Sequence, residues 1–385
     1  MLTLIKFELD KLVRNKTFLI TSVISLLAIA GIFLVGYYYS QVSYVEQKNA
    51  DKGYPEFYSE ITNKYAGEFN DQKVEEVLTD YMDRYQSHVD EEKRPFDVFS
   101  YYIGDIFFPK EEDVYLKMNE AMESGEKITF DQLDIRSVQE VGFASFDKPL
   151  KLGAYNTWGD LFSVTNSIFL LSCLLIIFIC SSVFSNDSAS NINQLLLSTK
   201  HGRGKLTAAK IMAATGISIP IFAAIQLISF LFFYYYHGIS GWDASIQTNF
   251  SFKLYDFPME MNNLQVYLLV IGVQMIGVLL IVGMTLLISS MTKSPFISLA
   301  TSLGAFFLPY LLGKIFQTGT MAKILNLFPI QHYQVEDMLT IMETDFVYFL
   351  HAFIPNVILT ICFALVIKIT ADLIIYFRMK YLQVK

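Results

Sequence analysis

The chain has 385 residues, of which 53% are hydrophobic and 17% are charged. A soluble domain carries about a quarter charged residues, so this composition excludes a disordered chain and disfavours an ordinary cytosolic enzyme. The net charge of −8 is unevenly spread, because residues 39–160 hold 13 basic and 26 acidic side chains and the rest of the chain is basic. Nucleic-acid binding is therefore not indicated.

The first element in chain order is a predicted amphipathic helix over residues 1–16. Apolar residues recur at helical spacing on one face, and charged residues occupy the other: Leu2, Ile5, Leu9, Leu12 and Val13 against Lys6, Asp10 and Arg14. Such a pattern is typical of a helix that lies in the inner membrane interface. A simple cytoplasmic flank of the following span is the alternative.

Six uncharged apolar runs are long enough to cross a membrane. A bilayer core about 30 Å thick needs roughly 20 helical residues, since a helix rises about 1.5 Å per residue. The predicted transmembrane helices are residues 17–39, 161–184, 211–236, 264–291, 294–313 and 346–375, of which the last continues beyond its uncharged run at 346–367. The first run is too long for a signal-peptide core, so we expect it to be retained. The sequence therefore predicts an all-α polytopic membrane protein with six transmembrane helices.

Between the first two spans lies a large acidic insert, residues 40–160. Its polarity and length suit a small domain folded in water. Helices are predicted over residues 71–90 and 114–123, and its tyrosines are expected to be core residues. The insert is interpreted either as a cap that holds a dimer together or as a domain for gating or substrate handling.

The distribution of Lys and Arg predicts the orientation, because cytoplasmic flanks of membrane helices are enriched in them. Basic residues gather before the first span, in residues 185–210 and in the tail 376–385, whereas the opposite segments 237–263 and 314–345 are acidic. Both termini are therefore expected in the cytoplasm, and the insert outside. Segment 314–345 is apolar but broken by Gly319 and Pro329, which predicts short helices that dip into the outer leaflet.

No motif for catalysis is found in the sequence. The nearest string to a phosphate-binding loop, residues 199–206, has Thr199 where the first Gly is required and Leu206 where a hydroxyl is required. The five histidines are scattered without metal-ligand spacing. We therefore expect no enzyme activity, no metal and no cofactor on this chain, and any ATP hydrolysis to belong to another subunit.

Few polar side chains interrupt the spans. The candidates for a polar pathway are Gln226, Gln274, His351 and Asn356. Hydrogen bonds between helices explain such residues equally well. Lys368 and Asp372 stand four residues apart near the inner end of the last span, where a partly solvated ion pair is a better interpretation than a proton relay.

The loop after the second span is the most informative stretch. Residues 185–210 read SNDSASNINQLLLSTKHGRGKLTAAK. This loop resembles the inner loop of ABC-2 type permeases, the membrane subunits of one class of ATP-binding-cassette transporter. The residues that carry the resemblance are Asp187, Leu195, Leu196, Ser198, Thr199, Arg203 and Lys210. The loop departs from the family pattern at Asn191-Ile192, which replaces Gly-Thr, and at Lys200, which replaces Pro.

The order of elements strengthens this resemblance: an amphipathic start, one helix, a large outer insert, and five more helices with a broken segment before the last. The resemblance implies two cytoplasmic ATPase subunits, which bind ATP and Mg, and a second permease chain, identical or homologous, in a bacterial cell membrane. The ATPase would dock on residues 1–16 and 185–210, with Lys6, Arg14 and Lys205 adding charge to the docking surface. For the loop alone, a juxtamembrane helix whose basic residues meet anionic lipid is the alternative.

The leading hypothesis from the sequence is thus a permease that exports or extracts amphipathic or hydrophobic cargo, such as antimicrobial peptides, drugs or lipids. A sodium exporter of the same family is one alternative. A membrane-anchored sensor or scaffold, with the insert as a ligand domain, is the alternative from a different class.

Overall fold

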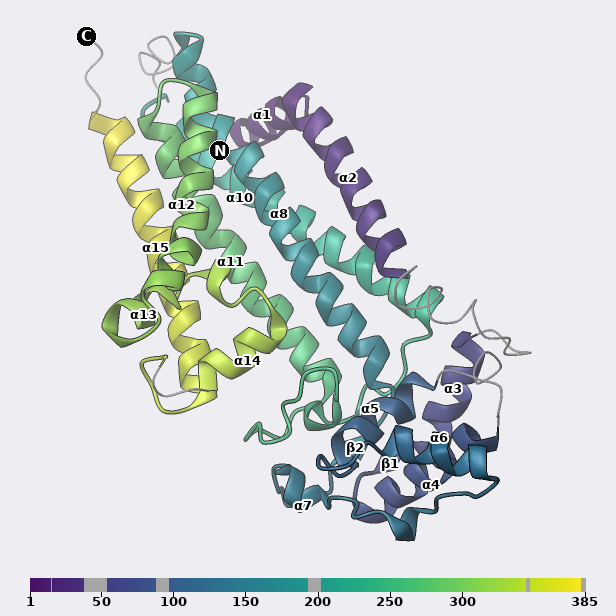
Figure 1. Ribbon diagram of the computed structural model, residues 1–385. Coiled ribbons are helices and arrows are strands. Elements are labelled where there is room, and N and C mark those ends of the chain that lie inside the picture. Colours follow the sequence, from purple (N-terminus) through teal and green to yellow (C-terminus); the bar gives the residue numbers. More distant parts are fainter. Residues whose placement is uncertain (15, 38–53, 88–96, 193–201, 344–346, 382–385) are drawn as a thin grey trace. The chain divides into compact units, whose positions relative to one another are not determined.

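The computed structural model describes residues 1–385 except 15, 38–53, 88–96, 193–201, 344–346 and 382–385 (Figure 1). The described chain is mostly helical and divides into two compact units. The bundle unit comprises Met1–Ile32, Thr165–Ser229 and Leu269–Lys385. The aromatic unit comprises Phe33–Val164 and Phe230–Leu268.

Five of the described helices are long and apolar enough to cross a membrane. They are α8 (Tyr155–Ala189), α10 (Lys205–Phe232), α11 (Asn263–Met291), α12 (Pro295–Ile315) and α15 (Phe353–Tyr381). The π-helical turn η4 (Phe233–His237) continues α10. Helices of membrane length are therefore confirmed at five of the six predicted spans. Helix α2 (Lys16–Tyr37) lies at the first predicted span, residues 17–39. Its apolar stretch Leu19–Val35 is shorter than those five helices, so this span stays a prediction.

Several helices begin or end away from their predicted bounds. Helix α8 extends beyond residues 161–184 at both ends, because Asp160 and Asp187 end the apolar run without ending the helix. Helix α10 likewise begins at Lys205 and not at residue 211.

Helix α15 begins at Phe353 and not at residue 346 as predicted. The Asn356 side chain donates hydrogen bonds to the carbonyl oxygens of Met342 and Leu350, both at 2.7 Å, and accepts one from the Leu350 N–H at 3.0 Å. These bonds hold the chain before Phe353 in turns, which hydropathy alone does not reveal.

The bundle unit contains the short helices predicted for residues 314–345. These are α13 (Gly319–Leu325), η6 (Pro329–Gln331) and α14 (Val335–Glu343). Gly319 has a φ of +80°, a conformation that glycine adopts without strain, and Pro329 occupies the first position of η6. The two predicted breaks are therefore confirmed with their causes.

Helix α1 (Leu2–Val13) occupies the predicted amphipathic start. Leu12 is buried in the core of the bundle unit, and Ile5 and Leu9 pack against that core. The helix is thus confirmed, and its place at a membrane interface stays a prediction.

The aromatic unit is built from short helices around one pair of described strands. Its elements are α3 (Tyr54–Tyr65), β1 (Gly67–Glu68), α4 (Asp71–Ser87), α5 (Val98–Phe107), α6 (Val114–Ser124), η3 (Phe130–Gln132), α7 (Val138–Val141), β2 (Lys151–Leu152) and η5 (Ile246–Thr248). Strands β1 and β2 pair antiparallel, with Gly67 opposite Leu152. Helices α4 and α6 confirm those predicted at residues 71–90 and 114–123.

Local capping and aromatic packing explain why this unit folds. Asp97 and Asp113 accept hydrogen bonds from backbone N–H groups in the first turns of α5 and α6. Buried aromatic rings form the core. The ring centres of Tyr155 and Phe250 lie 4.8 Å apart in an edge-to-face arrangement. Tyr65 and Tyr155 are fully buried in that core, as predicted for the tyrosines.

Candidate functional site

Four charged side chains of the bundle unit form a cluster that joins three helices. Helix α1 contributes Glu8 and Lys11, α8 contributes Asp187 and α10 contributes Lys210. The Lys11 Nζ atom lies 2.6 Å from Asp187 Oδ1, and the Lys210 ammonium pairs with Asp187 Oδ2. The four-charge cluster therefore connects the amphipathic start of the chain to the two helices that flank residues 190–204.

The position of Asp187 in its helix explains why it needs two cations. A carboxylate in the last turn of a helix meets the negative end of the helix dipole, which is unfavourable. Asp187 is also 2% exposed, so water does not compensate its charge. The ammonium groups of Lys11 and Lys210 supply the missing compensation from the neighbouring helices.

Lys210 is itself 4% exposed and is held by more than the ion pair. Its ammonium also donates to the Val183 carbonyl oxygen at 3.2 Å and lies 5.2 Å from the centre of the Phe184 ring. An ammonium has three donors, and a ring face attracts a cation. These contacts fix the start of α10 against the last turns of α8.

Glu8 completes the cluster from the apolar side of α1. Glu8 is 4% exposed, and burial raises the pKa of its carboxyl group, a shift that the Lys210 and Lys11 charges oppose and the Asp187 charge reinforces. With two lysines and two acids, the cluster is close to neutral as a whole. Removal of Asp187 would leave the buried ammonium of Lys210 without its ion-pair partner.

A serine of α11 holds the segment of α8 that precedes Asp187. The Ser289 hydroxyl donates to the Ser181 carbonyl oxygen at 2.7 Å and accepts from the N–H groups of Phe184 and Ser185, both at 3.1 Å. A side chain that enters a helical hydrogen-bond ladder marks a place where the helix can bend. Ser289 thus ties the C-terminal end of α8 to α11.

The structure brings two of the sequence-predicted coupling residues together, namely Asp187 and Lys210. Lys6 is exposed on α1, and Arg14 is exposed directly after it. Arg203 is exposed just before α10, and Lys205 is exposed at its first position. Leu195, Leu196, Ser198 and Thr199 lie outside the described residues. The ATPase-coupling role of all these residues stays a prediction.

Sequence reasoning missed Glu8 and Lys11 as members of the cluster. A signal for Glu8 was available, because it follows Ile5 by three residues and precedes Leu12 by four, which places it on the apolar face. An acid on an apolar helix face requires a partner on another element. No comparable signal identifies Lys11, since it lies with the exposed charges of α1 in sequence.

The candidate pathway residues fall into three places. Gln226 Nε2 donates to Gln274 Oε1 at 3.4 Å, and Gln274 Nε2 donates to the Tyr333 carbonyl oxygen at 3.3 Å. Asn356 makes the turn-forming bonds before α15, and His351 is exposed. The structure therefore pairs the two glutamines, and a transport pathway through any of the four stays a prediction.

An ion pair within α15 lies against a glycine of α11. Lys368 is 6% exposed and pairs with Asp372 one turn later. A Cβ atom added to Gly283 would lie 3.1 Å from the Lys368 Cα atom, so the glycine permits close helix contact. Lys368 is thus packed against α11, while the Asp372 side chain is 27% exposed, so the predicted ion pair is present and partly solvated at Asp372.

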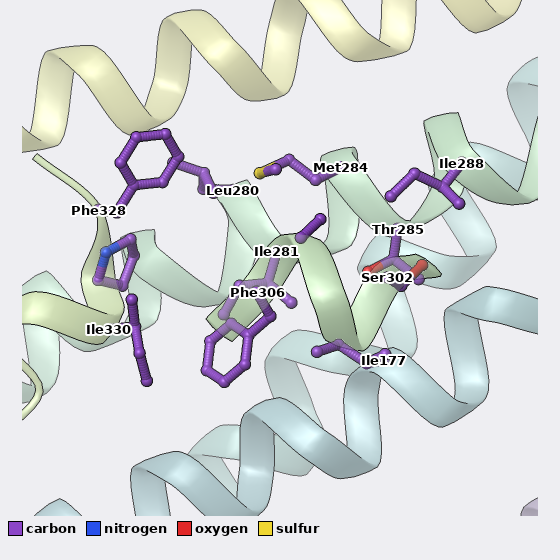
Figure 2. Close-up of a pocket in the computed structure, with 12 residues that line it drawn as sticks. Ile177, Leu280, Ile281, Met284, Thr285, Ile288, Ser302, Phe306, Phe328 and Ile330 are labelled. Atoms are coloured by element: carbon purple, nitrogen blue, oxygen red, sulfur yellow. The ribbon is translucent and has the colours of Figure 1, made fainter. Parts of the chain in front are cut away.

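Figure 2 shows a small apolar cavity within the bundle unit. Its volume is about 20 Å³, and α8, α11, α12 and the segment around η6 line it. The hydroxyls of Thr285 and Ser302 are polar groups among a lining of aliphatic and aromatic side chains. A space of this size accommodates about one water molecule.

Apolar helices of membrane length, which bury charges between them and expose hydrophobic side chains, define a polytopic helical membrane protein. The family model described as ABC-2 family transporter protein matches residues 2–379. The chain therefore belongs to the ABC-2 transporter family, as the resemblance in the inner loop predicted, and this family is the transmembrane component and not the ATPase. No curated protein and no solved structure matches the chain.

Proposed function

We propose that this chain is the permease subunit of an ATP-driven exporter and that the four-charge cluster is its coupling joint. A separate pair of cytoplasmic ATPase subunits would bind ATP and Mg and hydrolyse the ATP. A second permease chain, identical or homologous, would complete the complex in a bacterial cell membrane with both termini in the cytoplasm.

The observation that carries this proposal is the double ion pair of Asp187. Lys11 and Lys210 come from the two elements on which the family resemblance places the ATPase, the amphipathic start and the inner loop. Both bind the same carboxylate at the end of α8. Opposite charges attract more strongly in a buried environment than in water, so a push on α1 or α10 would also displace α8.

Ser289 extends this linkage toward the rest of the bundle unit. It binds the backbone of α8 between Ser181 and Ser185, just before the cluster. A displacement of the inner end of α8 would therefore reach α11. ATP binding drives such a change only if the partner ATPase has different affinities for the two arrangements.

The cargo that suits this bundle is amphipathic or hydrophobic, such as antimicrobial peptides, drugs or lipids. The spanning helices carry few polar side chains that could bind a hydrophilic solute, and the cavity in Figure 2 is too small for any of these cargoes because it accommodates about one water molecule. Sodium export is the alternative within the family, and it would require a site with several oxygen ligands for the ion. Stimulation of ATP hydrolysis by an amphipathic peptide, and not by sodium, would separate the two.

Purification of the tagged chain from its native host in mild detergent tests the proposal. A soluble nucleotide-hydrolysing protein should copurify, and R203A and K205A should release it because these exposed cations lie on the predicted docking face. K253A is the matched control, since Lys253 is an exposed cation on a segment predicted to lie outside. It should leave the complex intact.

Two results would contradict the proposal. Release of the ATPase by K253A as strongly as by R203A would show that the docking face is misplaced. Absence of any ATPase under conditions that preserve membrane complexes would favour a membrane-anchored sensor or scaffold.

A further inference from the structure

A polar pocket of about 360 Å³ lies between α1 and α8, next to the four-charge cluster. Its lining includes Glu8, Lys11, Leu12, Arg14, Ser182 and Asn186. The volume falls in the range of about 300–1,000 Å³ that is usual for small-ligand sites. The pocket shares Glu8 and Lys11 with that cluster, but the proposed function assigns no ligand to it.

The charges in the pocket are separated by depth. Glu8 is 4% exposed, and among the described residues no hydrogen-bond donor is found for its carboxylate. Lys11 also lines the pocket, but its ammonium is paired with Asp187. Arg14 is exposed, so its guanidinium stands nearer to solvent. The pocket therefore offers a buried carboxyl group, whose charge the nearby ammonium groups of Lys210 and Lys11 partly offset, and an outer cation.

The surroundings of the pocket favour a lipid. Helix α1 exposes Leu2, Phe7 and Val13, at 83%, 62% and 45% of their surface, beside a charged face. Exposed apolar side chains on an amphipathic helix are typical of a helix at the level of the lipid headgroups. A pocket on such a helix opens where phosphate and ammonium groups are concentrated.

We propose that this pocket binds the headgroup of phosphatidylethanolamine, with the lipid ammonium at Glu8 and the lipid phosphate at Arg14. A primary ammonium donates hydrogen bonds to a carboxylate, and a guanidinium donates in pairs to phosphate oxygens. The hydroxyl of Ser182 and the amide of Asn186 supply further hydrogen-bonding groups. The site rests on insertion in a membrane and not on the proposed cargo or ATPase.

The two charges predict selectivity among common phospholipids. The quaternary ammonium of phosphatidylcholine has no N–H to donate to Glu8, and phosphatidylglycerol carries a phosphate without a cation. Free O-phosphoethanolamine presents the same ammonium and phosphate as the proposed lipid, so a test must distinguish the two sources.

Native mass spectrometry of the full-length chain, titrated with each of the three lipids, tests this site. The wild-type protein should retain phosphatidylethanolamine over phosphatidylcholine. E8Q should reduce this preference about tenfold, as expected for the loss of a hydrogen bond to a charged group. R14Q should weaken retention of phosphatidylethanolamine and phosphatidylglycerol alike, because both present a phosphate.

D10N is the matched control. It removes the same charge from the same helix, but Asp10 is exposed and does not line the pocket, so the lipid preference should persist. The measured quantity is the ratio of bound phosphatidylethanolamine to bound phosphatidylcholine, taken only for variants that elute normally in size exclusion. R14Q tests the same pocket without a change at Glu8.

Equal retention of phosphatidylethanolamine and phosphatidylcholine by the wild-type protein would overturn the proposal, and this result is expected if a segment of the ATPase fills the pocket. An unchanged preference in E8Q would overturn it as well. Binding of O-phosphoethanolamine as tight as that of phosphatidylethanolamine would assign the site to the free compound instead.

Discussion

The two units of this chain place their side chains in opposite ways. In the aromatic unit, Tyr65 and Phe99 are fully buried, and ion pairs such as Lys64 with Asp80 lie toward solvent. In the bundle unit, Leu27 and Phe296 are 68% and 77% exposed, while Asp187 and Lys210 are buried. The first arrangement suits water and the second suits lipid.

The difference shows what holds each unit together. Burial of aromatic rings away from water drives the packing of the aromatic unit. Lipid tails are as apolar as leucine, so the helices of the bundle unit gain little from that effect and associate through close packing, hydroxyls and ion pairs. A polar substitution should therefore be most damaging inside the bundle unit.

Loss of the Asp187 charge should give the largest effect. D187N would leave the ammonium groups of Lys11 and Lys210 without their buried partner, which we expect to cost about 3–5 kcal/mol of unfolding free energy. The counterpart in the aromatic unit is D80N, where the carboxylate is 35% exposed and the cost should be about 1 kcal/mol or less. Denaturant unfolding in detergent, followed by circular dichroism, measures both. Equal effects of the two variants would break the comparison.

A buried histidine of the bundle unit, His332, lies outside the spanning helices and should make the free energy of unfolding depend on pH. The His332 Nδ1–H donates to the Asn326 carbonyl oxygen at 3.0 Å, and burial lowers the pKa of His332 to about 4. The unfolded chain takes up the proton near pH 6.5. The neutral ring therefore contributes fully above pH 6.5, and about 3 kcal/mol is lost as the pH falls to 4.

Thermal unfolding between pH 7 and pH 4 checks this prediction in the wild-type protein and in H332Q. The variant should lose stability less steeply with falling pH, because it has no proton to take up at this position. H351Q is the matched control, since His351 is exposed, and it should follow the wild-type curve. A wild-type slope in H332Q would contradict the assignment.

The smallest of the three effects is expected at Ser289. S289A would remove the acceptor of two N–H groups of α8 and the donor to Ser181, at a cost of about 1–3 kcal/mol for buried groups left unsatisfied. S290A is the control, because the Ser290 hydroxyl donates to the Leu287 carbonyl oxygen of its own helix. Thermal shifts that are equal for both variants would show that Ser289 does not tie α8 to α11.

Hydropathy predicted six spans and the broken segment before α15, and the structure has helices of membrane length at five of the six, because length and composition alone decide them. Helix ends were harder to predict. Asp160 and Asp187 look like loop residues in a hydropathy reading, yet both lie in α8. The start of α15 depends on the tertiary hydrogen bonds of Asn356, which no local pattern displays.

The candidate site was predictable in part. The family pattern of the inner loop contained Asp187 and Lys210. Lys11 was not predictable, since its pairing with Asp187 spans 176 positions and depends on how α1 folds back onto α8. Pairings at such separation follow from packing, and the charge pattern of one helix leaves them open.

A distance measurement tests the coupling joint most directly. Spin labels at Thr3 on α1 and Met212 on α10, both exposed, would be placed in a chain with the exposed Cys362 replaced by serine. Pulsed electron resonance should give one narrow distance, unchanged when the copurified ATPase binds ATP, because Asp187 locks the two helices together. D187N should broaden it. A distance that changes with ATP in the wild-type protein, or that stays narrow in D187N, would contradict the account.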